Sequence, residues 1–270
     1  MSFNVRGSFR DLGRPNAWPN RAAKNVAAIR RHAPDLIGLQ ECQRGNLSAY
    51  GKRLPRLVHI RGPAYGNVPP HDFNAILFDP ARLELVESGG FWLSETPGRR
   101  SRSWETRVAR SANWALFRSA GGPLLHINTH LDHKSARARR NGSDLIVSKV
   151  EGLLENFGPK TPAIVTGDFN CRPGTPTYET FAGAGFLDTF LAAGNTDDAS
   201  ANTFHAFEGN DYRDPRPGRG PRRIDWILLK DPADRLRIVS QEILNAEAEG
   251  PPYPSDHHPI LATFAGSYAG

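Results

Sequence analysis

The chain is poor in cysteine and in long apolar stretches. Its two cysteines, Cys42 and Cys171, supply neither a disulfide framework nor the ligand spacing of a structural zinc site. We expect both to be small buried thiols that pack behind a site. No apolar run reaches the roughly 18 residues that a membrane-spanning helix needs. A disulfide scaffold and a transmembrane helix are therefore excluded.

The N-terminus lacks the pattern of a leader sequence. No charged segment followed by an apolar core precedes the first expected strand, so we find no signal peptide and predict a cytoplasmic protein. That strand begins directly after Met1, which leaves open whether further residues lie upstream.

Glycine and proline are plentiful instead. The 26 glycines and 22 prolines are too many for long helices and favour short strands joined by tight turns. A hydrophobic content of 39% is enough to bury a core, and no linker, repeat or low-complexity tract interrupts the chain. We therefore expect a single domain over residues 1–270, and a monomer.

Positive charge is in moderate excess. The formal net charge is +6, and arginines gather in two segments rich in proline or glycine, residues 98–102 and 214–223. These segments could line a groove for a phosphate-bearing partner such as a nucleic acid. Solvated surface loops would have the same composition, and the sequence supports both interpretations equally.

Strands outnumber long helices in the predicted secondary structure. We predict helices over residues 21–31, with Asn20 as N-cap, and over about 137–157. Residues 74–78 and 83–86 should form a hairpin that turns at Asp79-Pro80. Further strands are expected at 36–39, 123–128, 162–166, 224–229, 236–243 and 259–264. This order fits two mixed sheets packed face to face and flanked by helices better than a doubly wound parallel sheet.

Polar residues stand at the ends of these strands. Glu41, His130, Asp168 and Asn170 follow strands, whereas Asp225 and the pair Asp256-His257 lie at or just before the start of one. In antiparallel neighbours these ends coincide, so the side chains should meet at one edge. Carboxylates beside a histidine can hold a hard divalent cation and place a water molecule, which points to hydrolysis of a phosphate ester. His126, in the expected strand 123–128, is better explained as a satisfied core histidine.

Six polar motifs occur in a fixed order along almost the whole chain: residues 2–6, 39–41, 128–131, 166–170, 223–227 and 254–260. In these motifs the sequence resembles the endonuclease/exonuclease/phosphatase superfamily, and it is similar to its CCR4-like and sphingomyelinase-like branch. The resemblance implies a DNase I-like four-layer α/β sandwich, with two mixed, mainly antiparallel sheets flanked by helices. It also implies a metal-dependent hydrolase that acts on ester bonds.

The resemblance carries roles for individual residues. Glu41 and Asp256, with Asn4 beside them, would hold Mg²⁺ or Mn²⁺. Asp168 would orient the attacking water, and Asn170 would bond a non-bridging oxygen.

Two histidines complete the implied catalytic set. His257 would contact the scissile phosphate, with Asp225 fixing its tautomer. His130 would pair with Asp72, where the family usually has glutamate, so the carboxylate arm is one methylene shorter.

Two arginines match positions found in similar bacterial members. Arg110 and Arg139 could each hold a substrate phosphate through two parallel hydrogen bonds, and the alternative for both is a surface ion pair.

Three functions are compatible with these residues. The favoured one is hydrolysis of a phosphodiester in nucleic acid or a nucleotide-like molecule. The second is a phosphomonoesterase, or a phosphoesterase of phospholipids or inositol phosphates, with the same centre. The third is an inactive binding module, against which the intact set of polar residues argues.

Overall fold

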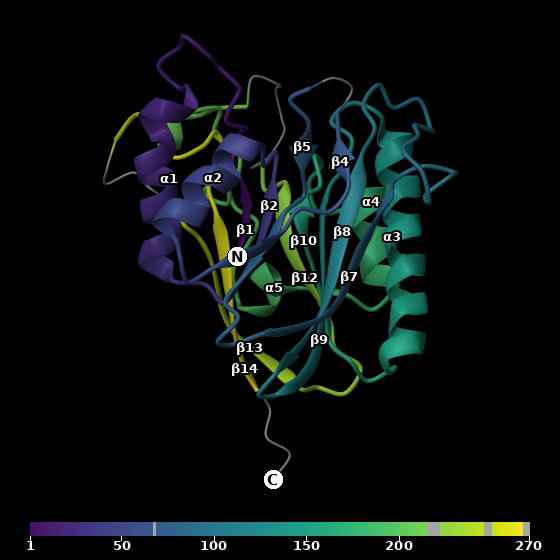
Figure 1. Ribbon diagram of the computed structural model, residues 1–270. Helices are drawn as coiled ribbons and strands as arrows, with labels where there is room; N and C mark the ends of the chain where they lie inside the picture. Colours follow the sequence, from purple (N-terminus) through teal and green to yellow (C-terminus); the bar gives the residue numbers. More distant parts are fainter. Residues whose placement is uncertain (67–68, 215–221, 246–249, 267–270) are drawn as a thin grey trace.

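Two six-stranded mixed sheets pack face to face in the computed structural model, which describes residues 1–66, 69–214, 222–245 and 250–266. Helices α1 and α2 cover the outer face of the first sheet, and α3 and α4 cover that of the second (Figure 1). The expected four-layer α/β sandwich is confirmed. No helix in these ranges combines the length and apolar character needed to cross a membrane.

The two sheets differ in which part of the chain supplies them. The first has the order β13 (Leu236–Ile243), β14 (Ile260–Gly266), β1 (Ser2–Asn4), β2 (Leu36–Gln40), β6 (Ile76–Phe78) and β3 (Val58–Ile60). The second has the order β11 (Leu187–Asp188), β12 (Asp225–Lys230), β10 (Ala163–Asp168), β9 (Gly122–His130), β8 (Ser111–Ser119) and β7 (Glu84–Trp92). The remaining elements are β4 (Ala64–Tyr65), β5 (Asp72–Phe73), α1 (Trp18–His32), α2 (Arg44–Arg53), α3 (Ala136–Phe157), α4 (Pro176–Gly183), α5 (Thr189–Ala192) and a 3₁₀ turn, η1 (Gly209–Asp211).

Both long predicted helices are present, but the first begins earlier than predicted. Ala17 is the N-cap residue of α1, Pro19 lies in its first turn, and the Asn20 side chain instead donates to the carbonyl of Pro15. Proline favours the first turn because its missing N–H is not needed there, so the predicted cap at Asn20 was wrong. Helix α3 begins at Ala136, where the Ser135 side chain accepts from the amide of Ala138.

The predicted hairpin at Asp79-Pro80 is also wrong. Strand β6 pairs with β2 and β3 in the first sheet, whereas β7 pairs with β8 in the second. The turn therefore carries the chain from one sheet to the other. Two apolar runs joined by a short turn give the same local pattern in both cases, because the pattern does not record which strand lies alongside.

A row of polar side chains is buried between the sheets. Asn128 in β9 donates to the carbonyls of Leu39 (2.8 Å) and Ala75 (3.0 Å) and accepts from Gln40 Nε2 (2.7 Å). Thr166 Oγ1 also bonds Asn128, at 3.1 Å. Buried backbone carbonyls and amide groups are costly unless paired, so this row fixes how the two sheets register against each other.

His126 extends the same row away from the site. Its Nε2 lies 2.9 Å from Thr166 Oγ1, and the side chain is 1% exposed. Burial, and less strongly the N-terminal amino group, lowers the pKa of His126 to about 3. The predicted burial of His126 in the core is confirmed, but only Nε2 is paired, because Nδ1 has no hydrogen-bond partner among the described residues.

Replacing Asn128 should separate the role of this row from ordinary packing. We expect Asn128→Leu to lower the free energy of unfolding by about 3 kcal/mol, because two carbonyls and the Gln40 amide each lose a buried hydrogen bond. Chemical denaturation measures the loss. The control Asn20→Ala, on the exposed end of α1, should change stability by less than about 0.5 kcal/mol. Equal effects of the two variants would contradict the role given to Asn128.

His126 should make stability depend on pH. A histidine whose folded pKa is depressed contributes stability that is present above the unfolded value of about 6.5 and is lost as the pH falls below it. Between pH 7 and pH 5 the wild type should therefore lose about 2 kcal/mol more than His126→Gln, followed by urea denaturation at each pH. Parallel pH profiles for the two proteins would show that His126 is not held neutral.

Candidate active site

Most of the predicted polar residues line one cavity, at the end of the two sheets where β4 and β5 lie (Figure 1). Strand register places three of them level with one another, because Asp168 in β10 pairs with His130 in β9 and with Asp225 in β12. Glu41 and Asn170 follow β2 and β10 in the left-handed backbone region, each with φ of 53°. That conformation costs energy for residues with a side chain and is often found at functional sites.

His257 and Asp225 form one charged pair. His257 Nδ1 lies 2.8 Å from Asp225 Oδ2, and its Nε2 lies 3.7 Å from Asp168 Oδ2. Burial alone would lower the pKa of His257, but Asp225 and Asp168 together raise it to about 10. The two carboxylates therefore favour the protonated imidazole, which donates from Nδ1 to Asp225.

Asp168 lies at the centre of the site. Its carboxylate accepts from Asn4 Nδ2 (3.0 Å) and from the backbone amide of Asn170 (2.9 Å). Burial, followed by the charge of Asp225, raises the pKa of Asp168 above its usual range. The carboxylate is thus joined to the first sheet through Asn4 and to the second through its own strand.

His130 has different neighbours from those expected. Its Nε2 lies 2.9 Å from Asn170 Nδ2 and 3.4 Å from Asp168 Oδ2, while its Nδ1 lies 3.3 Å from the hydroxyl of Tyr65. Asp72, its expected partner, instead accepts from Gln43 (2.8 Å) and Arg10 (3.0 Å). The shorter aspartate arm and the charge of Arg10 favour that arrangement.

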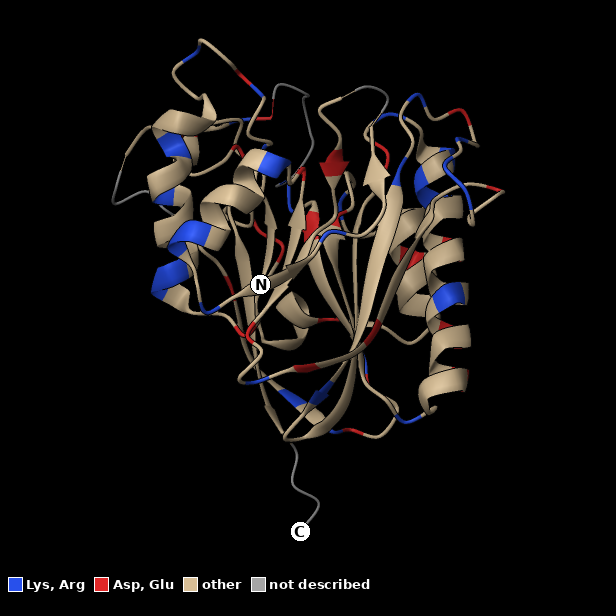
Figure 2. Cartoon of the chain, in the orientation of Figure 1, with Lys and Arg blue, Asp and Glu red and all other residues tan. Residues whose placement is uncertain are grey.

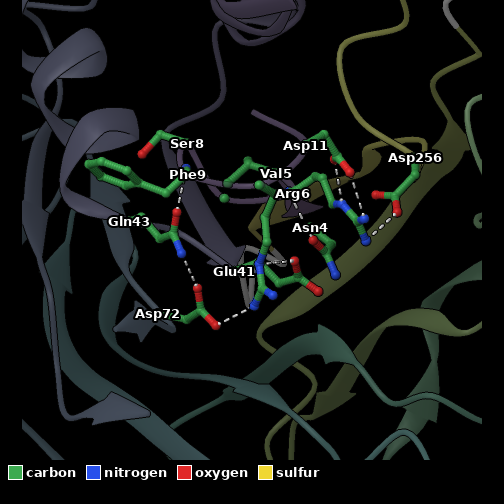
Figure 3. Close-up of polar contacts among 12 residues, drawn as sticks. Asn4, Val5, Arg6, Ser8, Phe9, Asp11, Glu41, Gln43, Asp72 and Asp256 are labelled. Atoms are coloured by element: carbon green, nitrogen blue, oxygen red, sulfur yellow. Dashed lines mark hydrogen bonds and ion pairs between the residues drawn. The ribbon is translucent and has the colours of Figure 1, made fainter. Parts of the chain in front are cut away.

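The carboxylates expected to hold the metal lie on the first sheet's side, among arginines that sequence reasoning missed. Figure 3 shows Arg6 between Asp11 and Asp256, with Glu41 and Asp72 on the other side of Asn4. Arg6 Nη1 lies 3.2 Å from Asp256, and Arg10 lies 3.9 Å from Glu41. Arg6 lies in the polar motif at residues 2–6, so the sequence did indicate that it is close to the site. Arg10 lies in none of the six motifs, and nothing in the sequence indicated its role.

A buried arginine of α1 holds two loops of the site together. Arg21 is fully buried and donates to the carbonyls of Val5 (2.7 Å), Gly7 (3.2 Å) and Pro254 (3.1 Å). The segment after β1 and the segment that leads to Asp256 are therefore fixed to one side chain. An arginine on a helix gives no sequence signal for this role.

The site opens into a cavity of about 560 Å³. Arg110 lines it, with Nη2 3.3 Å from His133 Nδ1 and with a buried Nε that has no hydrogen-bond partner among the described residues. Arg139 does not line it. That side chain donates to the carbonyl of Asp132 and borders a separate cavity beside Cys171. The position of Arg139 on α3 directs its side chain away from the active-site cavity. Its place in the sequence does not determine this direction.

A second group of possible metal ligands overlaps the charged pair. Ligand atoms of Asp168, Asp225 and His257 all lie within 4.8 Å of one another. A metal there would have to displace the proton that the two aspartates favour on His257. The carboxylates of Glu41 and Asp256 form a separate group of oxygen donors in the cavity.

Comparisons with known proteins identify the family and the fold. A sequence model of the Endonuclease/Exonuclease/phosphatase family matches residues 1–257. The solved structure of a mannosyl-6-phosphatase from Bacteroides thetaiotaomicron is 27% identical, with a TM-score of 0.83 and 98% of each chain covered. The catalytic domain of human Nocturnin shares the fold at 20% identity and a TM-score of 0.72, covering 98% of this chain and 91% of that one.

Curated sequences give a more distant match. Human Nocturnin is 24% identical over 276 residues, which cover 92% of this chain but only 58% of the relative. The chain thus spans little more than half the length of that protein. From the match over residues 1–257, the chain belongs to the endonuclease/exonuclease/phosphatase family.

Proposed function

We propose that the chain is a divalent-metal-dependent phosphoesterase that hydrolyses a compact phosphorylated molecule, with Asp168 orienting the attacking water. The observation that carries this proposal is a cavity of about 560 Å³ in which Asp168, Asn170 and His257 face Arg6, Arg10 and Arg110. Its size lies within the range of small-molecule sites.

The donor atoms on the first sheet's side fit a hard divalent cation. Glu41 Oε2 is buried and has no hydrogen-bond partner among the described residues, and Asp256 lies beside it in the same cavity. Asn4 provides a neutral oxygen nearby. Mg²⁺ or Mn²⁺ bound there would polarise the phosphoryl oxygen and offset its developing charge.

Residues of the chain would align the water, accept its proton and bond the phosphoryl oxygens. Asp168, held by Asn4 and the amide of Asn170, would align the water and accept its proton. The cation His257, supported by Asp225, would donate to a phosphoryl oxygen, and Asn170 would bond another. His130 would hold Asn170 and Asp168 in place.

A compact phosphate monoester is the substrate that the charge distribution favours. Figure 2 shows lysine and arginine spread over α1, α2, α3 and the loops at both ends of the sheets. Four arginines, Arg6, Arg10, Arg110 and Arg222, line one cavity. Arg110, whose buried Nε has no hydrogen-bond partner among the described residues, could bond a dianionic monoester there. The mannosyl-6-phosphatase among the similar structures is, by its name, a monoesterase of a phosphorylated sugar.

A nucleic acid or nucleotide-like diester is the second candidate. The net charge of +6 favours it, and so does the exposed Arg99 in the arginine segment 98–102. Within that segment, however, Arg100 donates to the carbonyl of Gly66 and Arg102 to that of Arg107. Most of the second arginine segment, residues 215–221, lies outside the described residues.

Removing one carboxylate charge should test the proposed metal ligands without an activity assay. We expect Glu41→Gln to weaken Mg²⁺ and Mn²⁺ binding by at least about tenfold, because the neutral amide keeps the shape but loses the charge that a hard cation requires. Isothermal titration calorimetry on the substrate-free protein measures this. The control Glu155→Gln, on the exposed face of α3, should bind as the wild type does. An unchanged affinity in Glu41→Gln would place the ion elsewhere.

The role of Asp168 and the choice of substrate can be tested together. We expect Asp168→Asn to reduce metal-dependent hydrolysis by at least about a thousandfold while the thermal transition stays cooperative, because the water loses its base. Wild type and variant would be assayed on p-nitrophenyl phosphate, sugar phosphates, inositol phosphates, sphingomyelin, bis-p-nitrophenyl phosphate, DNA and RNA. Variant-sensitive turnover of the monoesters alone is the expected result. Cleavage confined to nucleic acid would favour the second candidate, and full turnover by Asp168→Asn would refute the assigned role.

A further inference from the structure

We propose that Tyr65 is a positioning residue for His130, in the place where a carboxylate was expected. This inference rests on the proposed function, because it concerns how the same centre is held. Tyr65 belongs to none of the sequence motifs that indicated the site.

The hydroxyl of Tyr65 links two parts of the site. It accepts from the backbone amide of Glu41 at 2.8 Å and lies 3.3 Å from His130 Nδ1. The side chain is 1% exposed, and its ring meets the ring of His130 edge to face at 5.9 Å. The contact therefore joins the loop after β2 in the first sheet to the end of β9 in the second.

The short β4–β5 ladder explains why a tyrosine has this role. Tyr65 pairs directly with Asp72 across that ladder. Asp72 lines the cavity, whereas Tyr65 is buried and contacts His130, which lines it. Asp72 is already used by Arg10 and Gln43, which leaves His130 Nδ1 to the longer Tyr65 side chain. The guanidinium of Arg110 lies over the Tyr65 ring at 5.6 Å and fixes it from the other side.

A phenol and a carboxylate have different effects on an imidazole. Asp225 stabilises the protonated form of His257, whereas a neutral hydroxyl can donate to or accept from His130 without stabilising a positive charge. Burial and the nearby Arg110 lower the pKa of His130 well below its usual value. The centre thus contains one charged histidine and one neutral histidine, distinguished by their partners.

The orientation of His130 matters because of what its other nitrogen contacts. His130 Nε2 is 2.9 Å from the Asn170 amide and 3.4 Å from Asp168. In a neutral His130, Nε2 accepts from the Asn170 amide, so a ring free to rotate would release Asn170 from the geometry needed to bond the phosphate. Tyr65 therefore acts through His130 and not on the substrate.

Removing only the hydroxyl tests this role. In Tyr65→Phe we expect kcat to fall about tenfold with KM and the Mg²⁺ affinity changed less than twofold, since the loss lies in alignment and not in binding. Tyr50→Phe is the matched control, because Tyr50 is also buried and donates to Asn25 (2.6 Å) outside the cavity. That control should keep its kcat.

A double-mutant cycle separates positioning from a general structural effect. In a His130→Ala background, adding Tyr65→Phe should reduce kcat by less than twofold. The same tenfold loss in both backgrounds, or a weakened Mg²⁺ affinity as the main effect, would overturn the proposal and point to Glu41 or to the fold instead.

A spectroscopic measurement keeps the proposal testable if the substrate is misidentified or if Tyr65→Phe is destabilised. Long-range ¹H–¹⁵N spectra of the substrate-free protein should show His130 as one neutral tautomer in the wild type and in Tyr50→Phe. In Tyr65→Phe, held below its thermal transition, they should show a mixture. Identical His130 signals in all three proteins would overturn the proposal, whereas loss of activity on every substrate would affect only the proposed function.

Discussion

The buried amide of Asn128 is the contact on which the geometry of the site depends. It binds the carbonyl of Leu39, two residues before Glu41, and it lies two residues before His130 in its own strand. One side chain therefore sets the distance between the first sheet, which carries the proposed metal ligands, and the second sheet, which carries the proposed water-orienting group. Gly38 adds to this constraint, because a Cβ there would lie 2.1 Å from Thr166 Oγ1. Two sheets joined only by apolar side chains could slide past each other at much lower cost.

The site also depends on how its many charges are balanced. Acidic groups of the first sheet's side are neutralised by Arg6 and Arg10, which come from one short segment after β1. On the second sheet, Asp168 and Asp225 share the cation His257. Buried carboxylates would otherwise take up protons and lose the charge that orients water or binds metal. The nearby cations oppose this tendency in both halves, although burial still leaves the pKa of Asp168, Asp256 and Asp72 raised.

The general architecture could be predicted from the sequence because it follows from local patterns. Strand and helix periodicity fixed the layers, and the polar residues at strand ends converge as the register of β9, β10 and β12 requires. The main predictions that the structure does not support concern contacts between residues distant in sequence. The turn at Asp79-Pro80 joins strands of different sheets. Arg139 on α3 does not line the cavity, and Asp72 pairs with Arg10 instead of His130. Tyr65 was missed because a tyrosine in a short loop strand carries no local mark of its partners. Each outcome depends on a residue distant in sequence, which periodicity and spacing do not encode.

The central claim is that the metal binds on the first sheet's side of the site, apart from His257 and Asp225. The most direct test is diffraction from crystals soaked in Mn²⁺, recorded at a wavelength where manganese scatters anomalously. A metal centre on the first sheet's side predicts an anomalous peak at bonding distance from the carboxylates of Glu41 and Asp256, with Arg6 and Arg10 displaced toward Asp11 and Asp72. The pair His257 and Asp225 should remain intact. A peak among Asp168, Asp225 and His257 instead would contradict the proposed metal centre and the role of His257 as a cation.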